Sequence, residues 1–150
     1  MGPAAKILLL MQRVDTPLGL THKDRNNLLR NWGFQCTCSL CSSPDERDTS
    51  DTHRMRISRI WNGLEIYKHK NKAKVVELTR ELLKLLDVEE LTVRVGEFYE
   101  KLAKIYLDMG HIKGARKFGR LALKYWEEFD SIERDHVKEV LGFLQLLEKR

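Results

Sequence analysis

The sequence predicts an all-α protein in which a short helix and a cysteine-containing loop precede an antiparallel stack of helices. From residue 54 to the C-terminus, apolar residues recur at steps of three and four positions, as they do along one face of a helix. No stretch of appreciable length alternates between apolar and polar residues, which argues against strands. The segments between the apolar stripes are short, so successive helices are expected to lie antiparallel.

The first helix is expected in the segment TPLGLTHKDRNNLLRNWGF. Thr21 can cap the free N–H groups of the first turn, and Asp24 lies three positions later at the positive end of the helix dipole. Gly33 suits the end of the helix, where a left-handed conformation is needed. The apolar side of this helix is formed by Leu28, Leu29 and Trp32.

Residues 44–53 are predicted to form a solvated linker between residues 1–43 and a helical domain at 54–150. The stretch SSPDERDTSDTH around this linker is polar, carries Pro44 and has no apolar residue. The helical domain then follows in five stripes: Ile57, Ile60, Trp61 and Leu64; Val75, Val76, Leu78, Leu82, Leu83, Leu85 and Leu86; Phe98, Leu102, Ile105 and Tyr106; Ala115, Phe118, Ala122, Tyr125 and Phe129; Val137, Val140, Leu141, Leu144 and Leu147.

Residues 96–129 also match the 34-residue helix-turn-helix pattern of the tetratricopeptide repeat. Tyr99 takes the first large position and Gly110 the turn. Two positions differ from the repeat pattern: Gly119 stands where an aromatic residue is usual, and Glu127 stands where proline is common. Small residues stand where the two helices of a unit approach closely, at Ala103, Ala115 and Ala122. The sequence therefore favours a short tetratricopeptide-like stack, with a generic helical hairpin as the alternative.

Composition and charge favour a protein of a reducing compartment, either the cytoplasm or the nucleus. The 27 basic residues are interspersed with 22 acidic ones, which is typical of a mixed surface and does not indicate nucleic-acid binding. The apolar run from Ile7 to Met11 is too short for a signal peptide or a membrane span. The three cysteines are an odd number in one cluster, which argues against a disulfide framework.

The three cysteines form a C-x-C-x-x-C cluster at Cys36, Cys38 and Cys41, a spacing that can present three thiolates to one zinc ion. A tetrahedral site needs a fourth ligand, which must come from elsewhere in the chain, from a second chain in a dimer that shares the zinc, or from an absent part of a parent protein. His22 and His53 are the local candidates, although neither spacing is persuasive. Three free thiols in a loop are the alternative. Neither His111 nor His136 has a partner at ligand spacing in the sequence.

The stretch LGLTHKDRNNLLRNWGFQCTCSLCSSPDE resembles the end of the SET domain and the start of the post-SET zinc loop in fungal SET-domain proteins. These are relatives of the SET- and MYND-domain lysine methyltransferases, in which a tetratricopeptide-like helical domain follows the loop. The resemblance covers about residues 14–130. It implies that the fourth zinc ligand is a cysteine of the SET core. It also implies that Phe34 lines the adenine pocket for S-adenosylmethionine, with simple packing against Trp32 as the alternative.

The catalytic tyrosine of that family lies just before the stretch that reads DTPLGLT here, where this chain has Arg13 and no tyrosine before Tyr67. We therefore expect a protein truncated before or within the SET core, with no catalytic residue of its own. It is expected to be inactive alone, and to bind S-adenosylmethionine only if a SET core is present. The alternative is a non-catalytic tetratricopeptide-like interaction or scaffold module that binds a protein or peptide.

Overall fold

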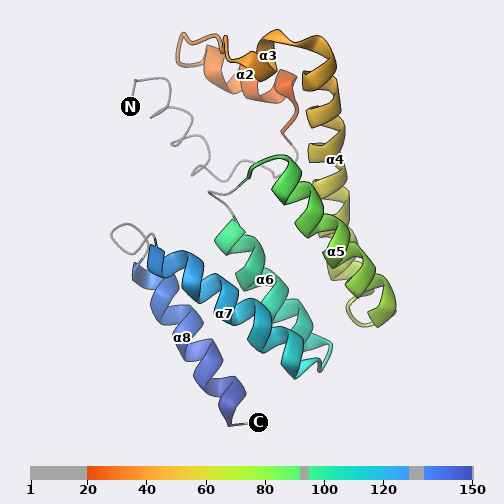
Figure 1. Ribbon diagram of the computed structural model, residues 1–150, viewed down its shortest axis with the longest axis vertical. Helices are drawn as coiled ribbons and strands as arrows, with labels where there is room; N and C mark the ends of the chain where they lie inside the picture. The colour runs from red at the N-terminus through yellow and green to blue at the C-terminus, as the bar shows by residue number, and fades with distance from the viewer. Residues whose placement is uncertain (1–19, 92–94, 129–133, 150) are drawn as a thin grey trace. The chain divides into compact units, whose positions relative to one another are not determined.

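A computed structural model describes residues 20–91, 95–128 and 134–149 (Figure 1). The regular elements of these described residues are all α-helices, which confirms the all-α prediction. The helices are α2 (His22–Arg30), α3 (Ser39–Ser42), α4 (Pro44–Tyr67), α5 (Lys72–Val88), α6 (Val95–Asp108), α7 (Ile112–Glu128) and α8 (Arg134–Glu148). The five stripes predicted from residue 54 onward coincide with α4 to α8. Phe129, in the fourth stripe, lies outside the described residues.

The prediction of a linker at residues 44–53 is wrong, because these residues form the N-terminal part of α4. Pro44 occupies the first helical position, where the N–H group that proline lacks would have no partner in the helix. Asp45 and Glu46 follow in the first turn, where their negative charges interact favourably with the positive end of the helix dipole. This part of α4 lacks apolar residues because it is largely exposed to solvent.

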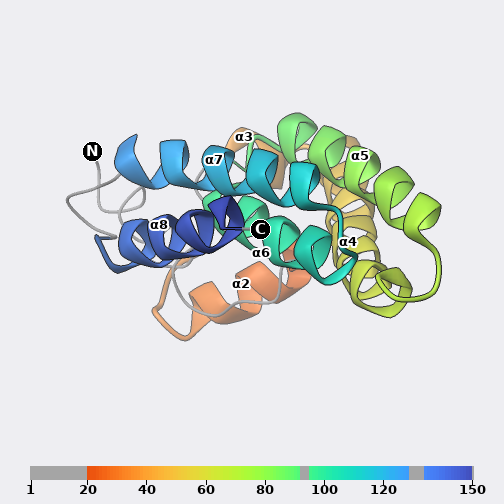
Figure 2. The same cartoon turned by 90° about the horizontal axis from the view of Figure 1, so that it is seen from below.

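The chain divides into two compact units, residues 1–62 and 63–150. In the second unit, α6 and α7 form an antiparallel hairpin, and α8 packs against α7 (Figures 1 and 2). The turn between α6 and α7 depends on Gly110, whose φ of +73° is accessible to glycine without strain. The N–H of His111 donates to the carbonyl oxygen of Tyr106 over 2.8 Å and closes the helix end.

The core of this hairpin combines large and small buried side chains from both helices. Phe98 and Leu102 are at most 1% exposed, and so are Ala103, Ala115 and Ala122. The predicted small positions are therefore buried, as expected where two helices approach closely. Leu141, predicted in the apolar stripe of α8, is instead 42% exposed.

The lysine-rich loop between α4 and α5 is partly neutralised by ion pairs. Lys68 Nζ lies 2.8 Å from Asp108 Oδ2 and 2.9 Å from Glu65 Oε2. The hydrogen bond to Asp108, followed by that to Glu65, raises the pKa of Lys68. His69, Lys70 and Lys72 lie exposed around it. The arrangement is that of a solvated loop.

Candidate metal centre

The chain enters the cysteine loop through a tight reversal at the end of α2. Gly33 has a φ of +67°, as the sequence predicted for this position. Its N–H donates to the carbonyl oxygen of Arg30 over 2.9 Å, and the N–H of Phe34 donates to that of Leu29 over 3.1 Å. This pair of bonds is the Schellman arrangement that ends many helices. It fixes the direction in which the half-buried Phe34 leads into the cysteines.

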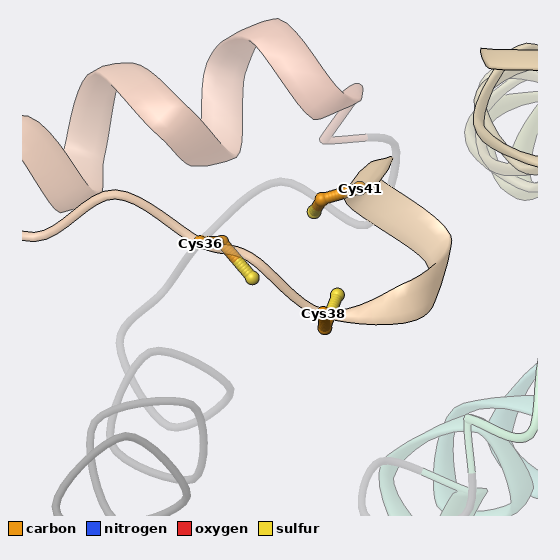
Figure 3. A group of neighbouring side chains, drawn as sticks. All are labelled: Cys36, Cys38 and Cys41. Carbon is orange, nitrogen blue, oxygen red and sulfur yellow. The ribbon is translucent and has the colours of Figure 1, made fainter. Parts of the chain in front are cut away.

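The single turn of α3 brings the three cysteines together, as Figure 3 shows. Cys38 precedes α3 in extended conformation and Cys41 lies within it, so the chain folds back toward Cys36. The three Sγ atoms all lie within 4.8 Å of one another. In a tetrahedral zinc site with bonds of about 2.3 Å, sulfur atoms are about 3.8 Å apart. Small side-chain rotations would therefore bring these sulfurs to the spacing of a zinc site.

The thiols already interact through hydrogen bonds. Burial tends to raise the pKa of Cys38, but hydrogen bonds from the N–H of Cys41 and from the neighbouring thiols outweigh it and lower that pKa. Burial, together with hydrogen bonds and the proximity of the other two sulfurs, raises the pKa of Cys41 to about 12. A metal ion that binds all three sulfurs must displace these protons, so the affinity is expected to rise with pH.

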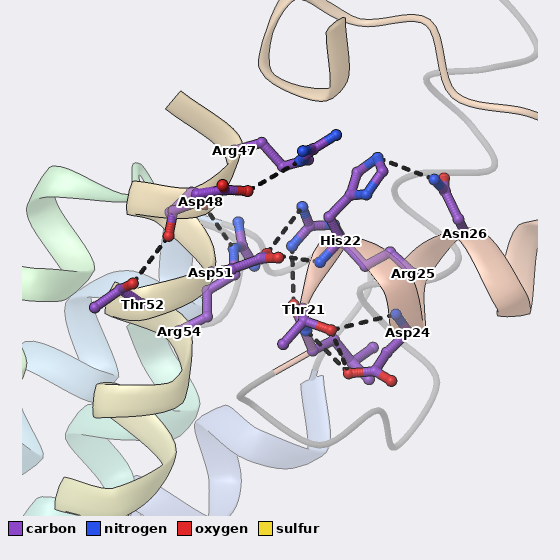
Figure 4. Close-up of polar contacts among 12 residues, drawn as sticks. Thr21, His22, Asp24, Arg25, Asn26, Arg47, Asp48, Asp51, Thr52 and Arg54 are labelled. Carbon is purple, nitrogen blue, oxygen red and sulfur yellow. Dashed lines mark hydrogen bonds and ion pairs between the residues drawn. The ribbon is translucent and has the colours of Figure 1, made fainter. Parts of the chain in front are cut away.

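The fourth coordination position is open among the described residues. No further histidine, aspartate, glutamate or cysteine of the described ranges belongs to this group of ligand atoms. His22 is engaged elsewhere, because its Nε2 lies 2.9 Å from Nδ2 of Asn26 (Figure 4). His53, on α4, is also outside the cluster. The structure thus brings together the three predicted cysteines and neither of the two histidines considered as a fourth ligand.

The start of α2 is held by its own cap and by α4. The side chain of Thr21 accepts from the N–H of Asp24, and Asp24 Oδ2 accepts from the Thr21 N–H over 3.2 Å, which confirms the predicted cap. The hydrogen bond from the Thr21 hydroxyl is the main cause of a lowered pKa at Asp24. From α4, Asp51 Oδ1 accepts from the N–H of His22 over 2.6 Å and lies 3.9 Å from Arg25 Nη2 (Figure 4). Asp51 therefore ties the helix before the cysteine loop to α4.

Replacing Asp51 with alanine is expected to lower the free energy of unfolding by about 1 kcal/mol, because the His22 N–H loses its acceptor and the Arg25 guanidinium loses an ion-pair partner. The matched control is Asp48→Ala on the same helix, since Asp48 is 73% exposed and pairs with Arg47 at the surface. The backbone amides of α2 should exchange their hydrogens faster in Asp51→Ala than in the parent protein, and should not do so in Asp48→Ala. Equal exchange in the two variants would contradict this role for Asp51.

A second group of metal-ligand residues lies in the other unit and was missed from the sequence. Ligand atoms of Glu100, His136 and Glu139 lie within 4.8 Å of one another. The expectation that His136 has no partner at ligand spacing is therefore wrong. Glu139 lies three positions further along the same helix, and Glu100 approaches from α6. The i, i+3 pair was the available signal, and the contribution of α6 required the tertiary structure.

Comparisons with protein families, curated proteins and solved structures find no match for this chain. Among the described residues, the helices lack the combination of length and apolar character that a bilayer crossing requires.

Proposed function

We propose that Cys36, Cys38 and Cys41 bind zinc, and that the chain is the post-SET zinc loop and helical-repeat region of a SET-type protein-lysine methyltransferase. The observation that supports the zinc site most directly is the convergence of three sulfur atoms with no fourth ligand among the described residues. The fourth ligand then comes from a SET core or from a second polypeptide. Because zinc thiolates need reduced cysteines, the cytoplasm or nucleus is the proposed location.

In this proposal the zinc ion stiffens the loop that carries Phe34. Phe34 stands two positions before Cys36, directly after the turn at Gly33, so the end of α2 holds one end of this short segment and a metal bound to the cysteines would restrain the other. Phe34 would then lie against the adenine of S-adenosylmethionine when a SET core is present. This chain contributes no catalytic group to methyl transfer. The helical-repeat region of the chain binds a protein or peptide partner.

The zinc proposal is tested by metal analysis and thiol alkylation of the purified full chain. We expect zinc to protect all three thiols from alkylation and a chelator to expose them together. Independent alkylation of each cysteine, at rates unchanged by zinc, would contradict a shared site.

The relation to methyltransferases is tested by calorimetric titration with S-adenosylmethionine. The chain alone is expected to show no binding, because the resemblance assigns the remainder of the cofactor pocket to the SET core. Micromolar affinity for the isolated chain would contradict this assignment of the pocket.

The exposure of Cys38 favours one further arrangement, in which two copies share a zinc ion. A second copy could reach the open position from solvent, and its thiolate would complete the tetrahedron. Sedimentation of the chain with half a molar equivalent of zinc distinguishes an ion shared by two copies from an ion bound by a single copy. A dimer that a chelator dissociates supports sharing, and a monomer with bound zinc excludes it.

The second candidate function is a non-catalytic tetratricopeptide-like interaction module. It is favoured by the hairpin of α6 and α7, whose buried alanines occupy the small positions of that repeat. If the chain is such a module, a variant with Cys36, Cys38 and Cys41 replaced by serine should co-purify with the same proteins as the parent chain. Loss of those partners in the serine variant would tie the interaction to the zinc loop.

A further inference from the structure

Glu100, His136 and Glu139 form a compact set of oxygen and nitrogen donors in the second unit. His136 and Glu139 lie one helical turn apart on α8, and Glu100 faces them from α6. Nδ1 of His136 is 3.1 Å from Oε2 of Glu100. Zinc bonds to nitrogen and oxygen of about 2.0–2.2 Å place tetrahedral ligand atoms about 3.3–3.5 Å apart. The separation in the structure is therefore close to that of two ligands of one metal ion.

The surroundings hold the imidazole of His136 in position. The ring of Trp126 stacks on that of His136, with centroids 4.4 Å apart and an angle of 17° between the planes. Trp126 is only 4% exposed, so this stacking restrains the orientation of the imidazole. Restraint of this kind keeps a histidine ligand in place before the metal arrives.

A small cavity adjoins the two carboxylates. It has a volume of about 30 Å³ and is lined by Glu100, Glu139, Ala103, Lys104, Gly119, Val140 and Phe143. A water molecule needs about 10–15 Å³ measured in this way, so the cavity has room for at least one. A metal ion held by three side chains could thus complete its coordination with water.

The charges also suit a divalent cation. Lys104 Nζ lies 3.0 Å from Oε1 of Glu100, whereas the His136 contact uses the other oxygen. The side chain of Lys104 is 57% exposed, and that of Glu100 is 12% exposed. One exposed ammonium group only partly offsets two carboxylates.

We propose that Glu100, His136 and Glu139 bind a divalent transition-metal ion of the zinc type, with a remaining position open to water. Imidazole nitrogen and carboxylate oxygen are both ligands that Zn²⁺ takes in proteins. The ion would join α8 to α6 and so stabilise the second unit. This site is independent of the cysteine loop and of the function proposed for it.

The test uses the full chain with Cys36, Cys38 and Cys41 replaced by serine, so that sulfur no longer competes for metal. Calorimetric titration with Zn²⁺ should show saturable binding, and Co²⁺ should give visible absorption without a sulfur charge-transfer band. Glu139→Gln in this background should weaken Zn²⁺ binding by at least about 100-fold, since loss of an outer-shell partner alone costs 10- to 100-fold. Glu139 is exposed, so this substitution leaves the fold intact.

The matched control is Glu148→Gln, which removes an exposed carboxylate near the end of the same helix. It should leave the affinity unchanged, and Zn²⁺ should raise the melting temperature of the control but not of Glu139→Gln. Absence of saturable binding in the serine background would overturn the proposal. Equal affinity in the two glutamine variants would also overturn it.

Discussion

Replacement of Cys36 with serine is expected to weaken zinc binding by the cysteine loop by more than about 100-fold. A serine hydroxyl stays protonated at neutral pH and is a poor zinc ligand, so only two thiolates would remain of the three that converge in the structure. Loss of an outer-shell partner already costs about 10- to 100-fold, and loss of a direct ligand should cost more. Cys36 is half-exposed in a loop, so the fold should not change.

The measurement is competition with a chromophoric zinc chelator, performed in a Glu139→Gln background to silence the second site. The matched control is Ser39→Ala, because Ser39 is exposed within the same loop and offers no thiolate. The control should keep the affinity of the parent protein. If Cys36→Ser also kept it, the zinc would be held by other residues and the proposed site would be wrong.

Replacement of Gly114 with alanine is expected to lower the free energy of unfolding by about 1–2 kcal/mol. A Cβ at this position of α7 would collide with the ring of Tyr106 and lie 2.7 Å from Nδ1 of His111. Tyr106 cannot move easily, since it is 6% exposed and its ring packs edge-on against that of Phe118 at 5.0 Å. Overpacking costs about 1–3 kcal/mol, which exceeds the gain of up to about 1 kcal/mol for alanine in a helix.

The matched control for this prediction is Gly142→Ala in α8. No other atom lies within 4 Å of a Cβ built at Gly142, apart from its own chain neighbours and helix backbone. Alanine there should raise the free energy of unfolding by about 0.5–1 kcal/mol. Chemical denaturation of both variants should therefore give changes of opposite sign. Changes of the same sign would contradict the close packing of α6 on α7.

Features encoded by local sequence were predicted well. The apolar period located the helices from α4 onward, because a helix that packs on one side must repeat its buried residues every three to four positions. The cap at Thr21 and the reversals at Gly33 and Gly110 were visible because each depends on a residue type with a specific backbone role. The spacing of the cysteines likewise predicted their convergence.

Features that depend on the surroundings of a residue were predicted poorly. The first turns of α4 carry no apolar stripe because they are solvated, so their polar sequence resembled a loop. The contact of His136 with Glu100 joins residues 36 positions apart and leaves no local pattern. The fourth ligand of the cysteine site was not predictable from spacing, since the described residues do not provide one.

Zinc X-ray absorption spectroscopy of the full chain shows directly whether zinc is bound by three sulfur atoms. The Glu139→Gln variant loaded with one equivalent of zinc limits the signal to the cysteine loop. We predict three sulfur neighbours at about 2.3 Å and one lighter neighbour at about 2.0 Å. A coordination shell that contains only nitrogen and oxygen would rule out a zinc site at Cys36, Cys38 and Cys41.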